Sequence, residues 1–353
     1  MHNGKKEMTN IRDLTIEELK KYLTLSGEKD YRALQIFEWF HKHMIDDIEC
    51  ASNLGKELKK NIKDNFDTAF PSIKSEYISK IDDTKKYLIR LSDGLLIESV
   101  LMKYKYGYTV CVSSEVGCNM GCKFCASTIG GLKRNLSPFE MLSEVYLISK
   151  KNGIKISNVV IMGIGEPLKN YDNVIRFIKL LNDPHGQNIS MRNVSLSTCG
   201  IVENIYKLAS ENLPITLALS LHATTQEQRE KLMPVAKMYD IESVMEAMAY
   251  YFEKTNKRIT FEYSLIDGIN SSSEDAHELI ELFRKSFKNR HIDFNVNLIA
   301  INEIKERSYT APDRKKIETF MNILKNSGVS VMLRRELGKD ISGSCGQLRM
   351  SES

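Results

Sequence analysis

The feature that most constrains the fold is a regular alternation of short apolar runs and amphipathic stretches from Tyr108 onward. Seven runs are rich in β-branched or aromatic residues: YTVCVSS, ISNVVIMG, NVSLST, ITLALSLH, RITFEYSLI, DFNVNLIAI and VSVMLRR. Stretches with helical periodicity separate most of them, among them 138–152, 171–182 and 272–288. This alternation predicts parallel βαβ units that close into a full or partial barrel. In barrels of this class the chemistry lies at the carboxyl ends of the strands.

The chain before Tyr108 is expected to fold differently. Thr15 and Glu18 form a capping box at the start of a helical stretch, and short helices are predicted up to about residue 75. Alternating residues after that point predict hairpins with a turn at 92–94. We therefore divide the chain into a helical accessory domain (1–75), a β-hairpin extension (76–107) and a barrel with a C-terminal cysteine segment (108–349).

Composition limits the class of protein. The 353 residues, 42% of them hydrophobic, can supply a large core. No run approaches the roughly 18 apolar residues of a membrane span, and the first residues lack the apolar stretch of a signal peptide. We expect a cytoplasmic monomer with no membrane partner, in which cysteines bind metal or act in catalysis. A balance of 50 basic against 46 acidic residues permits a nucleic-acid partner without demanding one.

Three cysteines lie within eight residues, in the segment CNMGCKFC: Cys118, Cys122 and Cys125. Three thiolates are one too few for a structural zinc site, which needs four ligands. A 4Fe–4S cluster held by three cysteines would leave one iron open to an external ligand. Cys111, seven residues upstream, could instead close a four-ligand site. The spacing alone leaves both alternatives open.

Small or polar residues follow several of the predicted strands, at Gly165, Glu166, Ser197, Ser220, His222 and Asn297. Gly165 allows a close backbone approach, and Glu166 can accept hydrogen bonds from a charged amino group. A phosphate-binding loop is excluded because Glu166 and Pro167 stand where a glycine and a helix start are needed. The serines, His222 and Asn297 suit a ribose, an adenine edge or a carboxylate, although each alone could be an ordinary strand-end residue.

The cysteine spacing, with Phe124 before the last cysteine, resembles the signature of the radical S-adenosylmethionine (SAM) superfamily. Six motifs together, among them VVIMGIGEPLKNYDNV and GKDISGSCGQL, resemble the dual-specificity 23S rRNA and tRNA adenine-2 methyltransferases from about residue 10 to 349. The resemblance implies a partial (β/α)6-type TIM-like barrel with a small N-terminal helical domain, a 4Fe–4S cluster on the three cysteines, and SAM. The implied SAM contacts are Gly165, Glu166, Ser197, Ser220, Leu221, His222 and Asn297.

The resemblance also implies catalytic roles outside the cluster. Carbon 2 of adenine is electrophilic, so a covalent carrier for the methyl group is needed. Cys345 in SGSCGQL matches the family's methyl-carrying cysteine. Cys111 matches the cysteine that releases the product through a transient disulfide, and Glu98 matches the proton acceptor. Cys50 and Cys199 are expected to be small buried hydrophobic residues.

The implied substrates are an adenosine at the peptidyl-transferase centre of 23S rRNA and one beside the anticodon in tRNA, with flavodoxin or ferredoxin as electron donor. Lys56, Lys59 and Lys60 are candidate phosphate contacts. Three alternatives remain: the sister enzymes that methylate carbon 8 and confer antibiotic resistance, a non-catalytic RNA-binding protein with a closed metal site, and a radical enzyme acting on a peptide. Pro167 favours carbon 2, and the SGSCGQL segment argues against the peptide.

Overall fold

The computed structural model describes residues 8–350, so the first seven residues of the predicted 1–75 domain lie outside it. Each of the seven apolar runs forms a strand. These are β4 (Gly107–Val112), β7 (Ile156–Ile161), β8 (Val194–Thr198), β9 (Thr216–Ser220), β10 (Ile259–Leu265), β11 (Phe294–Ala300) and β12 (Val331–Leu333). Every neighbouring pair in this series is parallel. The predicted partial barrel is confirmed.

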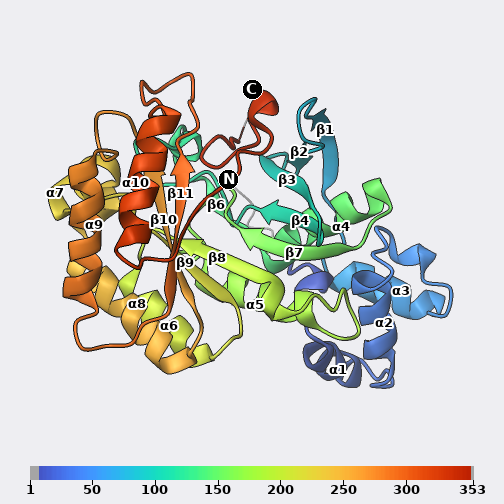
Figure 1. Cartoon of the computed structure of the whole chain (residues 1–353). Coiled ribbons are helices and arrows are strands. Elements are labelled where there is room, and N and C mark those ends of the chain that lie inside the picture. The colour runs from blue at the N-terminus through green and yellow to red at the C-terminus, as the bar shows by residue number, and fades with distance from the viewer. Residues whose placement is uncertain (1–7, 351–353) are drawn as a thin grey trace, which may run out of the picture.

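Helices join the strands and cover the outer face of the sheet (Figure 1). They are α4 (Pro138–Asn152), α5 (Tyr171–Asn182), α6 (Val202–Glu211), α7 (Gln226–Leu232), α8 (Ile241–Thr255), α9 (Ser273–Ser286) and α10 (Arg314–Asn326). The helices predicted at 138–152 and 171–182 have those bounds. Val159, Leu217, Phe261 and Leu298 are fully buried. These four residues lie in register on one face of the sheet, so the apolar positions of the runs mark the face that the helices cover.

The N-terminal part is helical, as predicted, with α1 (Ile16–Leu25), α2 (Arg32–His41) and α3 (Lys56–Asn65). Thr15 and Glu18 form the expected capping box. A buried arginine joins these helices to the barrel: the Arg12 guanidinium lies 4.3 Å from the Phe40 ring centre and 4.8 Å from that of Phe139 in α4. The N-terminal helices are therefore fixed to the barrel by packing rather than connected by a free linker.

The hairpin extension consists of β1 (Ser72–Ile78), β2 (Lys85–Arg90) and β3 (Leu96–Tyr104). These strands pair antiparallel, and β3 pairs with β4. Within the described residues they complete a ten-stranded sheet in the order β1-β2-β3-β4-β7-β8-β9-β10-β11-β12. The turn predicted at 92–94 is present. β1 begins at Ser72, before the predicted start of the extension at residue 76.

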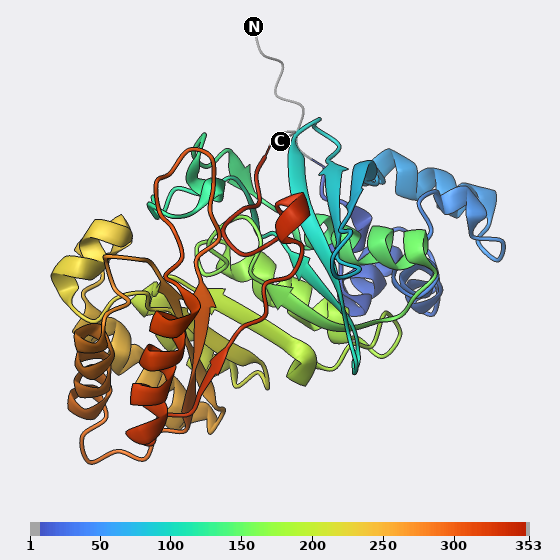
Figure 2. The same ribbon diagram turned by 45° about the horizontal axis from the view of Figure 1, so that its top comes forward.

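After β12 the chain forms a C-terminal strap, residues 334–350, which runs back across the molecule toward β1, β2 and β3 (Figure 2). The β1–β2 turn holds this strap. Ser79 Oγ donates to Asp340 Oδ1 at 2.7 Å, and the Gly338 N–H donates to Asp82 Oδ2 at 2.9 Å. The strap therefore connects the two edges of the open sheet. No helix in residues 8–350 is long and apolar enough to span a membrane.

Candidate active site

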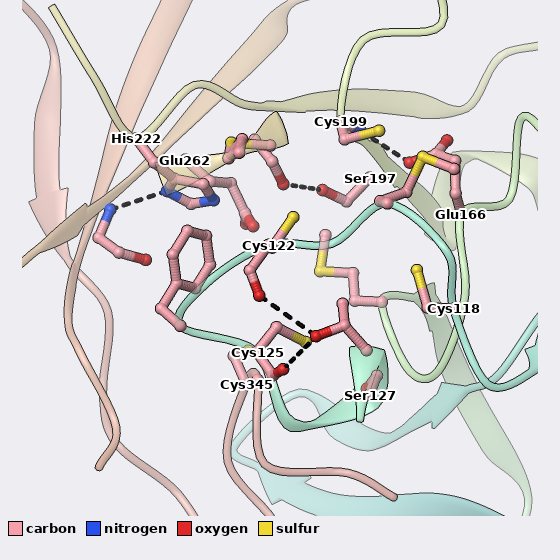
Figure 3. A pocket seen from close by; sticks show the side chains of 18 of the residues that line it. Cys118, Cys122, Cys125, Ser127, Glu166, Ser197, Cys199, His222, Glu262 and Cys345 are labelled. Atoms are coloured by element: carbon pink, nitrogen blue, oxygen red, sulfur yellow. Dashed lines mark hydrogen bonds between the residues drawn. The ribbon is translucent and has the colours of Figure 1, made fainter. Parts of the chain in front are cut away.

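A cavity, here the first cavity, lies at the carboxyl ends of the parallel strands (Figure 3). Strand ends supply Glu166, Ser197, Ser220 and His222 to its lining. The cluster loop (residues 117–128) follows the short strand β5 (Glu115–Val116) and ends with a 3-10 turn (Ala126–Thr128). It supplies Cys118, Cys122 and Cys125, and the strap supplies Cys345. The three predicted cluster ligands and five of the seven predicted cofactor contacts, Gly165 among them, thus line one cavity.

Local hydrogen bonds shape the cluster loop. Thr128 Oγ1 donates to the carbonyl oxygens of Cys122 and Cys125, at 3.3 and 2.9 Å. Burial, with smaller contributions from the neighbouring thiols, raises the pKa of Cys118, Cys122 and Cys125. A bound cation offsets the cost of burying a thiolate, because its positive charge stabilises the deprotonated form. Three such thiols on one loop fit an iron–sulfur cluster.

The geometry does not fit a single-ion site. In the described part of the chain, no three ligating side chains converge on a point suited to one metal ion. A 4Fe–4S cluster does not need such convergence, since each thiolate binds a different iron. Cys111 does not line the first cavity but a second one. The separate cavities favour a three-cysteine site over a closed four-cysteine site that includes Cys111.

Glu166 is buried and held by its neighbours. Its carboxylate accepts hydrogen bonds from Thr198 Oγ1 and from the Cys199 N–H, both at 2.7 Å. Burial raises the pKa of Glu166. Gly165 (φ 108°) has no room for a side chain, because a Cβ atom would lie 2.6 Å from Glu115. The backbone can therefore bring the Glu166 carboxylate to the cavity wall, where it can bind a charged amino group.

Glu115 lies behind this wall and was missed by the sequence analysis. Its Oε2 accepts a hydrogen bond from the Glu166 N–H at 2.8 Å, whereas its Oε1 is buried without a hydrogen-bond partner. Burial, with a smaller contribution from Glu166, raises the pKa of Glu115 to about 7. Only the fold reveals this pair, since 51 residues separate its members.

His222 is held in one tautomer. The Ser264 N–H can only donate, and it donates to His222 Nδ1 at 2.9 Å, so a proton on the neutral ring must be on Nε2. Burial lowers the pKa of His222 to about 3, and the ring is therefore neutral. Ser197 Oγ and Ser220 Oγ lie 3.3 Å apart across neighbouring strands. The cavity thus presents neutral polar groups beside Glu166.

Two of the predicted cofactor contacts do not line the first cavity. Leu221 is fully buried, and its N–H donates to the Glu262 carbonyl oxygen. Asn297 lies inside β11, where its Oδ1 accepts a hydrogen bond from Asn295. Asn297 pairs with Glu262, which lines the cavity, and Asn302, two residues beyond the end of β11, lines the cavity itself. The strand-end rule could have found Asn302 if the strand boundary had been known.

Asn302 also lines the second cavity, beside the predicted methyl carrier Cys345 and resolving residue Cys111. Asn302 Nδ2 donates to the Cys345 carbonyl oxygen at 3.0 Å, and Asn302 Oδ1 is buried without a partner. Arg334, which donates to Glu262 Oε1 at 3.1 Å, lines the same cavity. The two predicted catalytic thiols therefore share one cavity, and Cys345 lines both.

All seven cysteines are within the described residues, and all are free thiols. Cys111 is buried, and burial strongly raises the pKa of its thiol. Cys50 is exposed, so its prediction as a buried residue is wrong. Cys199 is buried as expected, but it also lines the first cavity.

Glu98 lies outside both cavities. It is 1% exposed and forms an ion pair with the equally buried Lys86 at 2.9 Å. The Arg349 N–H, from the strap, donates to its second oxygen at 2.7 Å. Burial raises the pKa of Glu98 in spite of Lys86. The strap therefore covers this carboxylate in the conformation described.

The candidate phosphate contacts differ in exposure. Lys56 and Lys60 are exposed on α3. Lys59 is buried, and its ammonium donates to the Glu49 carbonyl oxygen at 2.9 Å. The prediction of a phosphate contact is therefore corrected for Lys59, because its charge is already bound inside the helical domain.

Known proteins share this architecture. Residues 112–283 match the Radical SAM superfamily, and residues 9–67 match the ribosomal RNA large subunit methyltransferase N-terminal domain. A crystal structure of a radical SAM methyltransferase from Sphaerobacter thermophilus superposes with a TM-score of 0.91 and 36% identity, over 97% of this chain and 100% of that one. The fold and the three-cysteine loop define a radical SAM enzyme, which uses a 4Fe–4S cluster and SAM.

Similar curated proteins show which family of radical SAM enzymes the chain belongs to. A protein of Lachnoclostridium phytofermentans named "Probable dual-specificity RNA methyltransferase RlmN" is 50% identical over 98% of this chain and 95% of its own length. A protein of Clostridium perfringens with the same name is 47% identical over 98% of this chain and 97% of its own. The chain belongs to the RlmN family of dual-specificity RNA methyltransferases.

Proposed function

We propose that this enzyme methylates carbon 2 of one adenosine at the peptidyl-transferase centre of 23S rRNA and of one adenosine beside the anticodon in tRNA. The observation that carries this proposal is the second cavity, in which Cys111 and Cys345 lie together, with Cys345 also lining the first cavity beside the cluster loop. A methyl group carried on a thiol explains why two cysteines outside the cluster lie at the site.

The residues present fit both cofactors. Cys118, Cys122 and Cys125 would hold the 4Fe–4S cluster, and Glu166, Ser197, Ser220, His222 and Asn302 would hold SAM. When bound, the cluster supplies the single electron for reductive cleavage of SAM, the source of the radical that activates the methyl group on Cys345. Glu166 is placed to accept hydrogen bonds from the amino group of SAM, and the neutral His222 can donate from Nε2.

Cys345 and Cys111 divide the sulfur chemistry. The Cys345 thiolate displaces the sulfonium of one SAM molecule, so that a sulfur–carbon bond forms and S-adenosylhomocysteine leaves. Once that carbon is bonded to adenine, the Cys111 thiolate attacks the Cys345 sulfur. A sulfur–sulfur bond then forms, the sulfur–carbon bond breaks, and the released carbon takes a proton to become the methyl group. A thiol reductant restores both cysteines.

Glu98 is the proposed acceptor of the proton on carbon 2. Its raised pKa suits a base better than that of an exposed carboxylate. The Arg349 N–H occupies one of its oxygens, so the strap must shift before Glu98 can reach a substrate. The N-terminal helices, with Lys56 and Lys60 exposed, are the proposed RNA-binding domain, and a small electron carrier such as flavodoxin or ferredoxin is the proposed electron donor.

The test begins with peptide mass spectrometry of Cys345 after anaerobic cluster reconstitution and incubation with methyl-labelled SAM. A labelled methyl group on Cys345 is expected. Nucleoside mass spectrometry of treated rRNA and tRNA then separates 2-methyladenosine from 8-methyladenosine. An unmodified Cys345 in cluster-loaded protein would contradict the carrier mechanism, and 8-methyladenosine would contradict the carbon-2 assignment.

A further inference from the structure

A pair of tyrosines occupies the turn between β3 and β4. The rings of Tyr104 and Tyr106 are stacked, with centres 5.0 Å apart and planes 7° from parallel. Tyr106 is 69% exposed although Tyr104 covers one face of its ring. The other face of Tyr106 is therefore open to solvent. An exposed flat aromatic face is what an unpaired nucleobase stacks on in single-stranded RNA recognition.

The turn itself does not require these residues. Two-residue hairpin turns favour Asn, Asp and Gly, whereas this one places Lys105 and Tyr106 between the strands. The unusual backbone conformation falls on Gly107 (φ 126°), where a Cβ atom would lie 2.2 Å from Ser157 Oγ. Gly107 thus meets the steric demand of the turn, and Tyr106 remains free for another role.

The pair lies at the cavity that holds the catalytic thiols. Tyr104 lines the second cavity together with Cys111 and Cys345, so the stack extends from that cavity to the surface. Burial raises the pKa of Tyr104, which agrees with Tyr104 being the covered ring of the stack and Tyr106 the exposed one. A base on Tyr106 would therefore be close in space to an adenosine held at Cys345.

Positive charge accompanies the aromatic surface. Lys105 is exposed beside Tyr106 in the turn, and the exposed Arg335 lines the second cavity with Arg334. Arg334 is partly neutralised by Glu262. In the described part of the chain, neither Lys105 nor Arg335 forms an ion pair that would compete with a phosphate. Aromatic faces flanked by cations are the combination with which proteins bind unpaired nucleotides.

We infer that Tyr106, supported by Tyr104 and flanked by Lys105 and Arg335, is a stacking site for the unpaired base adjacent to the target adenosine. The inference rests on the proposed RNA methyltransferase function and adds a substrate requirement to it. The neighbouring nucleotide must be unpaired when the target adenosine enters the second cavity. A bulged or looped RNA meets this requirement, and a continuous duplex does not.

The experiment uses the cluster-loaded enzyme and RNA hairpins whose loop contains the target adenosine. 2-Aminopurine, a base whose fluorescence falls on stacking, replaces each flanking nucleotide in turn. Tyr106→Ala is compared with Tyr106→Trp, which restores an aromatic face. Tyr250→Ala is the matched control, since Tyr250 pairs with Tyr206 on the outer helices, at a ring distance of 4.8 Å.

For Tyr106→Ala we expect Kd to rise about tenfold or more, the loss typical of one stacked base, and the quenching at one flanking position to disappear. Tyr106→Trp should keep Kd within about twofold and retain the quenching. A hairpin in which that flanking nucleotide is base-paired should lose the difference between wild type and Tyr106→Ala.

Unchanged Kd and unchanged quenching in Tyr106→Ala, with folding verified by circular dichroism, would overturn the stacking site alone. Equal losses in Tyr250→Ala would also overturn it, because the effect would then not be local. Methylation of Cys345 in wild-type enzyme without RNA is measured in parallel. Its absence would count against the proposed function, so the two failures are distinguishable.

Discussion

Cys111 and Cys345 share a cavity but differ in surroundings. Cys345 is exposed on the strap, whereas Cys111 is buried on β4 with the pKa of its thiol raised. A buried thiol is a weak nucleophile until something removes its proton or admits water. Cys345 is therefore suited to the first sulfur reaction and Cys111 to the last, when the substrate already fills the cavity.

The different roles of Cys345 and Cys111 give the first prediction. Cys111→Ala should leave RNA covalently joined to Cys345, because nothing can displace the thioether. A protein–RNA adduct that survives denaturing electrophoresis is the expected readout. Cys345→Ala should give neither adduct nor methylated RNA, and Cys50→Ala, a change at a remote exposed cysteine, should behave as wild type. Multiple turnovers by Cys111→Ala would refute the resolving role.

The two asparagines Asn297 and Asn302 give a second prediction. Asn302 lines both cavities and bonds to the Cys345 carbonyl oxygen, so Asn302→Ala should lower methylation about 10- to 100-fold, the effect of losing a buried polar contact. Asn297→Ala, inside β11, should retain activity within about threefold. SAM affinity by calorimetry checks the cause. The reverse order of effects would favour Asn297 as the cofactor contact.

At the scale of elements, the strap depends on the β1–β2 turn. Asp340 accepts hydrogen bonds from Ser79 Oγ and from the Lys80 N–H, at 2.7 and 2.9 Å. We predict that Asp340→Ala speeds amide hydrogen exchange in residues 337–349 and lowers turnover, with little change in Tm because Asp340 is exposed. Asp172→Ala, an exposed carboxylate on α5, is the control. Unchanged exchange in the strap would contradict the role of the turn.

The start of α4 gives a pH prediction. Asp13 Oδ1 accepts the Phe139 N–H at 2.6 Å, and burial raises the pKa of Asp13 from 3.8 to about 6. The folded state therefore holds the proton more tightly than the unfolded state, and stability falls as pH rises from about 4 to 6. Asp13→Asn keeps an acceptor and removes this fall.

Above pH 6, Asp13→Asn should be more stable than wild type by about 1–3 kcal/mol, and the two should converge toward pH 4. Tm measured across this range checks the prediction, with Asp30→Asn as an exposed control. Parallel curves for the wild type and Asp13→Asn would mean that Asp13 does not carry the effect.

At the scale of the whole molecule, the net charge of +4 is small, so RNA affinity must come from local patches. Removing one phosphate contact reduces the slope of log affinity against log salt by roughly 0.7 to 1. Lys56→Ala on α3 should show this reduction for tRNA. Lys285→Ala on α9, at the opposite end of the molecule in Figure 1, should not. Equal slopes for both variants would exclude α3 from the RNA interface.

The sequence predicted the barrel strands because the residues that face the covering helices are apolar and recur along each strand. It predicted the cluster cysteines because they lie close together in one loop. Prediction from sequence failed for residues whose position depends on tertiary contacts. The end of β11 at Ala300 brings Asn302 to the cavity, and the sequence did not reveal this boundary. Lys59 points into the helical domain because its ammonium group donates to the Glu49 carbonyl oxygen. No pattern in the neighbouring sequence indicates that Cys50 is exposed. Such contacts join residues that no spacing rule connects.

The strap also sets an order for biosynthesis. Ribosomes make the sheet and the cluster loop before they make residues 334–350. Until then, the hydrogen bonds from the Ala126 N–H to the Gly346 carbonyl oxygen and from Ser127 Oγ to the Leu348 carbonyl oxygen cannot form. A cluster delivered in that interval meets a loop that the strap does not yet contact, whereas a later delivery meets the strap in place. We therefore expect the cluster to load more easily while the chain is still being translated.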